Sequence, residues 1–466
     1  VDSDIPDRIK DGYGLNQHLI DRAHEDGIDT IITCDNGIAA AKEIEYGKAL
    51  GMTIIVTDHH EVPYKENEAG RRYILPPADA VVDPRQEGCE YPFKGLCGAA
   101  VAYKLVEALC EANGQDVADL DYLLENVAIA TVADVMDLTE ENRILVKQGL
   151  EMLKRTSNLG LRALIQCIGL EGKKIQAYHI GFILAPCLNA SGKLDTAKRA
   201  LALLRAKTER EADMLAGDLK ALNESRRDMT DRVVDEAMAK VERTDIRGDK
   251  VLVIYLPDCH ESLAGLVAGR VRENYYRPVF VLTDSEDGVK GSGRSIESYS
   301  MYEELTGCGD LLTKFGGHPM AAGLSLDKEN VEKFKRRLND QCTLSEEELT
   351  EKVVIDMELP FAAITEQFIE ELEYMEPFGK GNTKPVFAAR GVVMQHVKII
   401  GKNKNVAKAT AIDAAGNRME AICFHDAQEF AERCERNNGK MSITFYPGIN
   451  EFRGERQIQI VITHYR

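Results

Sequence analysis

Two polar groups follow consecutive apolar stretches near the start of this 466-residue chain. Asp35 comes after the sequence IDTIIT, and Asp58, His59 and His60 come after MTIIV. Carboxylates and imidazoles without thiolates suit manganese or magnesium better than structural zinc. Two such ions would activate water and steady the attacking and leaving oxygens of a phosphodiester. The alternative interpretation is structural, with Asp58 capping a helix and both histidines packed in its first turn.

The elements around these residues alternate between strand and helix. Residues 28–33 and 52–56 are predicted strands, and residues 38–50 between them form a predicted helix. Continuous apolar strands in this order predict a parallel sheet that is covered on both faces. Asp35 and residues 58–60 follow the carboxyl ends of neighbouring strands, where open α/β sheets form their sites. This placement favours the metal site over the structural interpretation.

Further elements follow from the same kind of pattern. A third short strand is expected at 78–84 and a helix at 98–112. A second helix is expected at 121–138, and it contains Asp134 after an apolar stretch. Residues 207–243 are charged, lack proline and carry apolar residues at three-, four- and seven-residue steps. That spacing predicts one long amphipathic helix between two domains.

The second half of the chain has two further parts. A strand, helix, strand unit begins near residue 250 and runs into glycine-rich segments. The final part contains one helix and then short alternating segments, which predict a small closed β-barrel. The expected fold class is therefore α/β with a parallel sheet and a C-terminal barrel. The expected parts are a first α/β domain at 1–206, a connecting helix at 207–246, a second α/β domain at 247–345 and the barrel at 346–466.

The glycine-rich segments KGSGRS and FGGHPMAAG are expected to be loops. In the first, backbone amides could approach an anion, Ser292 could donate a hydrogen bond and Arg294 could offer a two-pronged phosphate contact. In the second, Gly316 and Gly317 would bring His318 close to a substrate. The alternatives are a tight turn with a surface arginine and a turn that leads into a buried strand.

The net charge of −19 argues against a protein that coats nucleic acid by bulk attraction. A local basic channel is still compatible with this charge. Residues 396–408 are the candidate because they hold four lysines and no acid, namely Lys398, Lys402, Lys404 and Lys408. A solvated loop between strands is the alternative interpretation.

The cysteines and the apolar segments bear on the compartment. The eleven cysteines are scattered and never spaced as CxxC, so a reducing, cytoplasmic environment is expected. No stretch approaches the roughly 18 apolar residues of a membrane span, and no basic-then-apolar leader opens the sequence. No membrane association is expected.

Several motifs together resemble a known family. TCDNGI at 33–38, VTDHHEVP at 56–63 and TVADVMDLTEENR at 131–143 resemble the second, third and fourth motifs of the DHH phosphoesterases. GSGRS and FGGHPMAAG resemble their DHHA1 partner domain. Within this superfamily, IPDRIKDGYGLN, LNASGKLDTA and MEPFGKGNTKPVF resemble segments of the bacterial single-stranded-DNA exonucleases called RecJ. The similarity runs from the first residue to the terminal QIQIVIT.

The resemblance implies a role for each residue of the predicted metal site. Asp35 would bridge two metal ions, and His59 and Asp134 would complete the shell of one of them. His60 would face the scissile phosphate. Asp58 would orient its neighbours without binding a metal itself. The implied cofactors are Mn²⁺ or Mg²⁺.

The resemblance also implies contacts to DNA. Ser292 and Arg294, together with Arg8, resemble a pocket that holds a 5′-phosphate and fixes 5′-to-3′ polarity. His318 and Asn189 would line the substrate path between the two domains, with His318 acting in catalysis. The barrel is similar to an OB-fold, which binds single strands through a basic groove and stacking rings. The other implied DNA-binding residues are Lys193, Gly316, Gly317, the four lysines at 398–408 and Phe452.

The implied function is metal-dependent, stepwise release of 5′-mononucleotides from single-stranded DNA in repair and recombination. A single-strand-binding protein and a helicase are the expected partners, and a monomer is expected. One alternative is a DHH phosphodiesterase for short oligonucleotides or cyclic dinucleotides, although such relatives usually lack a terminal barrel. Another is a non-catalytic single-strand-binding protein, which would bind DNA regardless of metal or of Asp35.

The chain departs from the family pattern in three places. The two residues before IPDR are commonly aromatic in the family and are Ser3 and Asp4 here. The first family motif, an aspartate-rich strand end, stands before IPDR in the family and is absent here, so we expect an N-terminally truncated chain in which one metal ion would lack most of its ligands. The family usually has an arginine where this chain has Lys193, which keeps the charge and loses the planar fork. Phosphate contact is expected to be weaker there.

Overall fold

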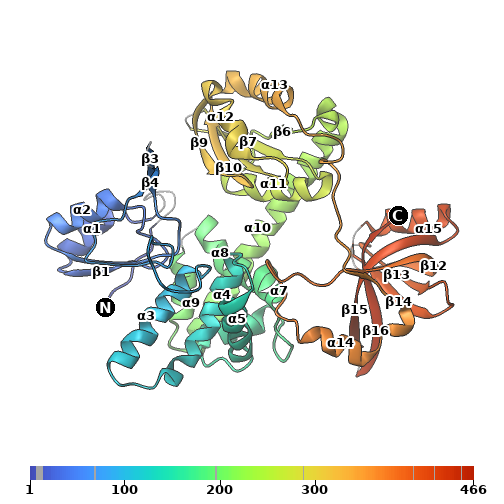
Figure 1. Ribbon diagram of the computed structural model, residues 1–466, viewed down its shortest axis with the longest axis horizontal. Coiled ribbons are helices and arrows are strands. Elements are labelled where there is room, and N and C mark those ends of the chain that lie inside the picture. The colour runs from blue at the N-terminus through green and yellow to red at the C-terminus, as the bar shows by residue number, and fades with distance from the viewer. Residues whose placement is uncertain are drawn as a thin grey trace. The chain divides into compact units, whose positions relative to one another are not determined.

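The computed structural model in Figure 1 describes residues 1–6, 14–67, 70–194, 197–286, 288–401, 404–424, 426–452 and 454–466, without the side chains of 67, 191–194, 452 and 455. The chain divides into two compact units. Unit 1 comprises Val1–Gly12, Asn158–Gly169 and Pro186–Lys352. Unit 2 comprises Tyr13–Ser157, Leu170–Ala185 and Val353–Arg466.

Unit 2 contains the parallel sheet that the apolar segments predicted. Its strands β1 (Thr30–Ile32), β2 (Thr53–Thr57) and β5 (Ala80–Val82) lie in the order β1-β2-β5. The helices α1 (Gln17–Glu25) and α2 (Ala41–Ala49) contribute to its core. This core consists of Ile20, Ile44, Met52, Ile54 and Val56, which are at most 2% exposed. Because the strands are parallel, the loops after them meet at one edge of the sheet.

Helices follow the sheet in unit 2. They include α3 (Gly98–Ala112), α4 (Leu124–Ala133) and α5 (Glu140–Leu153), and a 3₁₀ segment at Val117–Leu123 precedes α4. The helix expected at 121–138 is therefore shorter than predicted. Val135 has φ 55°, and this left-handed backbone ends the helix at Asp134. A hairpin of β3 (Tyr64–Asn67) and β4 (Gly70–Tyr73) was not predicted.

The C-terminal part of unit 2 is a closed barrel. The strands are β11 (Met357–Glu358), β12 (Phe387–Ile400), β13 (Val406–Ile412), β14 (Arg418–Cys423), β15 (Lys440–Phe452) and β16 (Glu455–Tyr465). They lie in the order β11-β12-β13-β14-β16-β15, and pairing of β12 with β15 closes the barrel. The helix α14 (Glu366–Glu373) lies between β11 and β12, and α15 (Ala427–Arg436) joins β14 to β15. The barrel core includes the buried Phe387, Phe430 and Phe445.

Unit 1 is built around a mixed sheet and one long helix. The helix α10 spans Glu209–Arg243, close to the expected 207–243. The strands β6 (Leu252–Tyr255), β7 (Val279–Ser285), β8 (Gly288–Arg294), β10 (Ala321–Leu326) and β9 (Leu312–His318) lie in that order. Alternate residues of β7 enter different cores, with Phe280 and Leu282 in one and Val279 and Val281 in the other. Both faces of this sheet are therefore covered at β7.

Shorter elements complete the two units. In unit 1, the helices are α6 (Leu159–Cys167), α9 (Lys198–Leu204), α11 (Glu261–Tyr275), α12 (Met301–Thr306), α13 (Val331–Gln341) and most of α8 (Ala185–Leu194). In unit 2, α7 (Ala177–His179) continues into a π-helical turn at Ile180–Leu184. Within the described parts of the chain, no helix combines the length and the apolar character that a membrane crossing requires.

Candidate metal centre and substrate pocket

Asp35 lies in the loop after β1 and adopts a left-handed backbone conformation with φ 64°. Its N–H donates to the carbonyl oxygen of Thr57 at the end of β2, at 3.1 Å. Gly98, the first residue of α3, leaves space for the Asp35 side chain. A Cβ on Gly98 would lie 2.6 Å from Oδ1 of Asp35. Three separate segments thus fix the position of this carboxylate.

His59 lies at the centre of the ligand cluster. Its Nε2 is 3.0 Å from Oδ1 of Asp35 and 3.5 Å from Oδ2 of Asp134. The His59 side chain is 8% exposed, whereas the two carboxylates are about half exposed. Burial raises the pKa of Asp134, and the nearby Asp35 raises it further. The predicted ligands Asp35, His59 and Asp134 are therefore brought together at one edge of the sheet.

Asp58 organises the segment that contains the two histidines. It is 1% exposed, and its Oδ2 accepts a hydrogen bond from the N–H of Ile38 at 3.0 Å. Its Oδ1 accepts from the backbone N–H groups of His59 and His60 and from Nδ1 of His60. Burial alone would raise the pKa of Asp58, but these hydrogen bonds lower it below its ordinary value. Asp58 is therefore a buried anion that orients both histidines.

His60 is the more accessible of the two histidines, with 43% of its side chain exposed. Its Nδ1 lies 2.6 Å from Oδ1 of Asp58, so the proton on Nδ1 faces a carboxylate. This hydrogen bond raises the pKa of His60. One ligand atom each from His60, His59 and Asp35 lies within 4.8 Å of the others. His60 is thus placed to act on a group bound at the centre.

The residues present fit a hard divalent cation. The nitrogen of His59 and the oxygens of Asp35 and Asp134 point at one another, and two carboxylates so placed repel each other unless a cation lies between them. Oxygen and imidazole ligands without a thiolate suit Mn²⁺ or Mg²⁺. The other ring nitrogen of His59, Nδ1, is buried and has no hydrogen-bond partner among the described residues. A metal on Nε2 would fix the tautomer that has its proton on Nδ1.

Asp83 is a buried acid at this edge that was not predicted as a site residue. It follows β5, is 2% exposed, and its Oδ1 accepts from the N–H of Arg85 at 2.8 Å. Burial, together with the nearby carboxylate of Asp58, raises the pKa of Asp83 to about 6. The rule that found Asp35 and Asp58, a polar residue after a parallel strand, also applies to Asp83.

In unit 1, the predicted phosphate-binding residues Ser292 and Arg294 lie on β8, and His318 lies on β9, with β10 between the two strands. In the strand register, Arg294 on β8 is opposite Ala321 on β10, and Ala321 is opposite His318 on β9. Residues opposite each other point to the same face, so His318 and Arg294 share a face about 10 Å apart. Ser292 is two residues from Arg294 and shares that face. Unit 1 therefore presents a serine, an arginine and an exposed histidine on one side of its sheet.

Arg294 and Ser292 are packed closely against α11. Nη1 of Arg294 donates to the carbonyl oxygen of Gly293 at 2.8 Å and to Oγ of Ser292 at 3.4 Å. A Cβ on Gly265 of α11 would lie 2.9 Å from both side chains, so a glycine is needed there. Burial lowers the pKa of Arg294, and the structure pairs it with no carboxylate among the described residues. A guanidinium in this setting is suited to an incoming anion.

The prediction that KGSGRS and FGGHPMAAG are loops was wrong. The first is part of β8, and the second forms the end of β9, a turn and the start of β10. The glycines of β8 are explained by packing. A Cβ on Gly291 would lie 2.4 Å from Leu282, and one on Gly293 would lie 2.6 Å from Met301. A loop rich in glycine and a strand that packs closely share the same composition.

The remaining candidates are less closely organised. Asn189 is exposed on α8, and Gly316 and Gly317 lie on β9. Arg8, Lys402 and the side chains of Lys193 and Phe452 lie outside the described residues.

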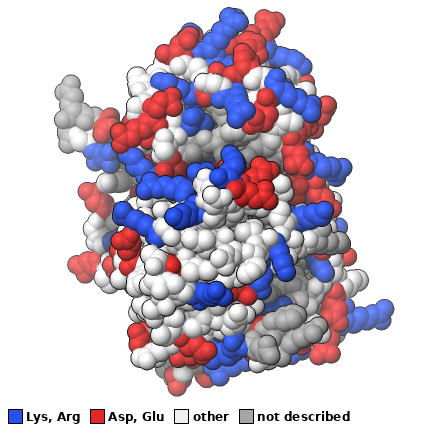
Figure 2. Space-filling view, turned by 90° about the vertical axis from the view of Figure 1, so that its right-hand side faces the viewer, with Lys and Arg blue, Asp and Glu red and all other residues white. Residues whose placement is uncertain are grey.

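The barrel lysines are found on neighbouring strands. Lys398 on β12 lies opposite Lys408 on β13, and Lys404 is exposed in the turn between these strands. Lys408 forms an ion pair with Glu420 at 2.8 Å, so its charge is partly neutralised. Figure 2 likewise shows basic and acidic side chains intermixed on one face of the molecule.

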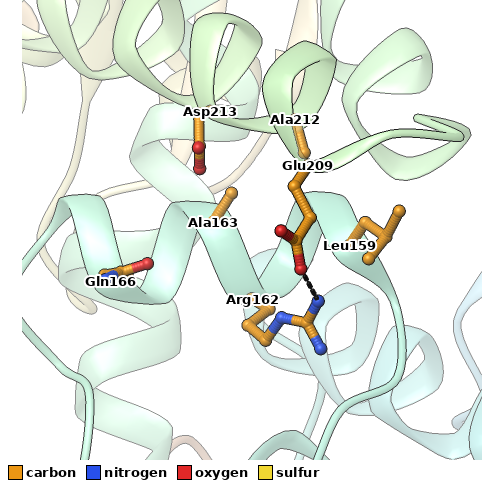
Figure 3. Close-up of a pocket in the computed structure, with 7 residues that line it drawn as sticks. All are labelled: Leu159, Arg162, Ala163, Gln166, Glu209, Ala212 and Asp213. Carbon is orange, nitrogen blue, oxygen red and sulfur yellow. Dashed lines mark hydrogen bonds and ion pairs between the residues drawn. The ribbon is translucent and has the colours of Figure 1, made fainter.

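A shallow pocket elsewhere in unit 1 contains none of the candidate residues. It lies between α6 and α10, and Figure 3 shows Arg162 of α6 paired with Glu209 of α10 at 3.1 Å. This ion pair joins the two helices.

Family models match three parts of the chain. Residues 1–131 match the N-terminal domain of the DHH family, residues 248–344 match the DHHA1 domain and residues 355–464 match the RecJ OB domain. The first contains Asp35 and the DHH segment, and the second contains Ser292, Arg294 and His318.

Individual proteins are similar over nearly the whole chain. A Bacillus subtilis single-stranded-DNA-specific exonuclease RecJ is 38% identical over 99% of this chain and 57% of its own length. The Escherichia coli protein of the same name is 33% identical over 99% of this chain and 81% of its own length. The crystal structure of Thermus thermophilus RecJ in complex with Mn²⁺ has a TM-score of 0.78 and 26% identity, covering 97% of this chain and 63% of that one. The chain thus spans little more than half of the Bacillus relative.

Proposed function

Because this chain belongs to the RecJ family of single-stranded-DNA-specific exonucleases, we propose that it is the metal- and DNA-binding part of a 5′-to-3′ exonuclease. The substrate is single-stranded DNA with a 5′-phosphate, and the products are 5′-mononucleotides. The observation that carries the proposal is the convergence of His59 Nε2 on the carboxylates of Asp35 and Asp134, at 3.0 and 3.5 Å.

Asp35, His59 and Asp134 would hold one divalent ion, Mn²⁺ or Mg²⁺. A bound ion of this kind lowers the pKa of its water and offsets charge on a phosphodiester. Manganese is present in the Thermus thermophilus structure, which supports the choice of metal. A second ion, as expected from the family, requires ligands beyond these three.

His60 and Asp58 act together on the scissile phosphate. Oδ1 of Asp58 accepts a hydrogen bond from Nδ1–H of His60, and this contact turns Nε2 of the ring toward the substrate side. The raised pKa of His60 keeps the ring protonated to a higher pH, so Nε2–H can donate a hydrogen bond to a phosphate oxygen. The buried anion of Asp58 also holds the backbone of both histidines. Asp58 is therefore a positioning residue.

Ser292 and Arg294 hold the 5′-phosphate, and this contact sets the polarity. The support is a guanidinium that is partly buried, hydrogen-bonded to Ser292 and free of a carboxylate among the described residues. His318 lies on the same sheet face and adds a further contact. Single-stranded DNA then continues over the barrel, where Lys398 and Lys404 contact its backbone. The monomeric state and the proteins that cooperate with it, a single-strand-binding protein and a helicase, are proposed from the family resemblance alone.

The test is digestion of a 5′-phosphorylated, 3′-labelled oligonucleotide with Mn²⁺. It uses this chain alone and the same chain fused behind a segment that carries the family's aspartate-rich motif. We expect the fused form to shorten the labelled strand stepwise, and Asp35→Ala to abolish this. Asp79→Ala, at a surface aspartate that pairs with Lys48, serves as the matched control. Binding of the strand without hydrolysis by the fused form would contradict the proposal and favour the binding-protein alternative.

A further inference from the structure

The segment Tyr374–Asn382, called here the strap, comprises Tyr374 and the first eight residues of the MEPFGKGNTKPVF motif, to which the proposed function gives no role. It connects α14 to the barrel within unit 2. Its own hydrogen bonds give it a defined shape. The side chain of Asn382 donates to the carbonyl oxygens of Met375 and Pro377 at 2.8 and 2.9 Å, and Gly379 and Asn382 exchange backbone hydrogen bonds.

The strap is bound to the segment that follows the metal ligand Asp134. The N–H of Leu138 donates to the carbonyl oxygen of Lys380 at 2.7 Å. Nζ of Lys380 lies 3.1 Å from Oδ1 of Asp137. Leu138 is 2% exposed and packs beneath Gly379, where a Cβ would lie 2.6 Å from its Cδ1. A backbone hydrogen bond, an ion pair and an apolar contact therefore hold the adjacent residues Asp137 and Leu138.

Further contacts anchor the strap to neighbouring elements. Arg143 of α5 donates to the carbonyl oxygens of Tyr374 and Glu376 at 2.8 and 3.2 Å. Gln176 donates to Oε1 of Glu376 at 2.7 Å, and Lys174 pairs with the same carboxylate at 3.1 Å. The first residues of the strap are thus attached to α5 and to the segment before α7.

The segment 135–140, which the strap contacts at Asp137 and Leu138, has an unfavourable backbone. Val135 has φ 55° and Glu140 has φ 44°, and the left-handed region is especially costly for a β-branched residue. Such conformations persist where the surrounding structure holds them in place. Asp134 lies between the end of α4 and this segment, so the position of its carboxylate depends on how the segment is held.

We infer that the strap is a positioning element for the metal site, which holds the segment 135–140 and thereby places the carboxylate of Asp134 against His59. The inference rests on the proposed role of Asp134 as a metal ligand. It links the barrel to the metal site, because the strap leads directly into the first long strand of the barrel. No residue of the strap is required to touch substrate or metal.

The test exploits two glycines with similar backbones in unit 2. Gly381 in the strap has φ 74°, and a Cβ there would lie 3.0 Å from Cβ of Asp137 and 3.2 Å from Cγ2 of Thr139. Gly416, in the turn between β13 and β14, has φ 89° and nothing within 4 Å of an added Cβ. Gly381→Ala and Gly416→Ala therefore introduce similar backbone strain. Only the former pushes on the segment after Asp134.

The measurement is the dissociation constant of Mn²⁺, obtained by electron paramagnetic resonance titration of the full chain. Gly381→Ala should weaken binding about tenfold, as changes beside metal ligands commonly do. Gly416→Ala should lower the melting temperature comparably and leave the constant unchanged. Unchanged binding in Gly381→Ala would overturn the inference, and so would equal weakening in Gly416→Ala. If the unsubstituted chain fails to bind Mn²⁺, both the proposed metal site and the inference are overturned. That outcome differs from failure of the inference alone, in which the unsubstituted chain still binds Mn²⁺.

A second pair covers the case in which Gly381→Ala does not fold. Gly379→Ala places a Cβ against Leu138, and Gly448→Ala on β15 places one in open space, both at ordinary φ. Weaker Mn²⁺ binding in Gly379→Ala alone supports the inference, and equal binding in both variants refutes it. Affinity for an oligo-dT strand in EDTA should be unchanged in every variant, because the strap acts on the metal site.

Discussion

The replacement of Asp58 by asparagine tests how the DHH segment is held together. The carboxylate accepts four hydrogen bonds, three on Oδ1 and one on Oδ2. An asparagine can keep its oxygen toward the histidines only by turning its NH₂ group toward the N–H of Ile38. That buried N–H would then be unsatisfied, at a cost of about 1 to 3 kcal/mol. The histidine hydrogen bonds would also lose the assistance of the negative charge.

The expected decrease in the free energy of unfolding follows from these contacts. A hydrogen bond to a charged group contributes about 1.5 to 3 kcal/mol and a neutral one about 0.5 to 1.5 kcal/mol. The free energy lost at the His60 hydrogen bond lies at the lower end of the range for charged groups, because 43% of the His60 side chain is exposed to solvent. We therefore expect Asp58→Asn to lower the free energy of unfolding by about 3 to 5 kcal/mol. The pKa of His60 should fall, because the partner that raises it loses its charge.

The pH dependence of stability has a defined sign. The folded pKa of His60 is raised, so its contribution is complete below its unfolded pKa and is lost as the pH rises through the folded value. The folded pKa of Asp58 is lowered, so its contribution is complete above its unfolded pKa and is lost as the pH falls through the folded value. The pair of Asp58 and His60 therefore stabilises the fold most between the unfolded pKa of Asp58 and the unfolded pKa of His60. Asp58→Asn should remove this dependence.

The assay is an NMR titration of the His60 ring combined with urea unfolding, both in EDTA. Asp79→Asn is the matched control, because Asp79 is a surface aspartate that accepts from Lys48 and from the backbone of Ile54. It should leave the pKa of His60 unchanged. A His60 pKa that is the same in Asp58→Asn as in the parent chain would refute this account of the DHH segment.

Three further predictions concern other residues of the two sites. Gly98→Ala should weaken Mn²⁺ binding at least tenfold, because the added methyl group displaces the Asp35 carboxylate; Gly217→Ala, on open helix surface, is the control for titration calorimetry. Arg294→Lys should reduce the preference for a 5′-phosphate over a 5′-hydroxyl strand in fluorescence anisotropy, because lysine lacks the two-pronged contact; an unchanged preference would remove Arg294 from the pocket. The raised pKa of Asp83, about 6, means that the unfolding free energy should fall as the pH rises from 4 to 6, by up to about 3 kcal/mol. Asp83→Asn in EDTA should flatten that slope, and an unchanged slope would place its origin elsewhere.

The positions of the proposed metal ligands Asp35 and His59 could be predicted because a simple rule governs them. Parallel strands share one carboxyl edge, so Asp35 and the DHH segment were expected to meet there. The structure brings them together and adds Asp134 from the end of α4. Asp83 was overlooked although it follows β5 in the same way.

Other features depend on packing that local sequence does not encode. The glycines of β8 have the composition of a loop, and only the neighbouring Leu282 and Met301 explain why they lie in a strand. The hydrogen bond between Leu138 and Lys380 joins residues that are far apart in the chain. No periodicity or spacing predicts such a contact, so the role of the strap emerges only from the fold.

The central claim is that Asp35, His59 and Asp134 form one metal site. The most direct measurement is manganese binding by electron paramagnetic resonance to the parent chain, to His59→Ala and to the control His260→Ala, which changes a helix cap in unit 1. The account predicts that His59→Ala loses bound Mn²⁺ while His260→Ala retains it. Full manganese occupancy in His59→Ala would contradict it.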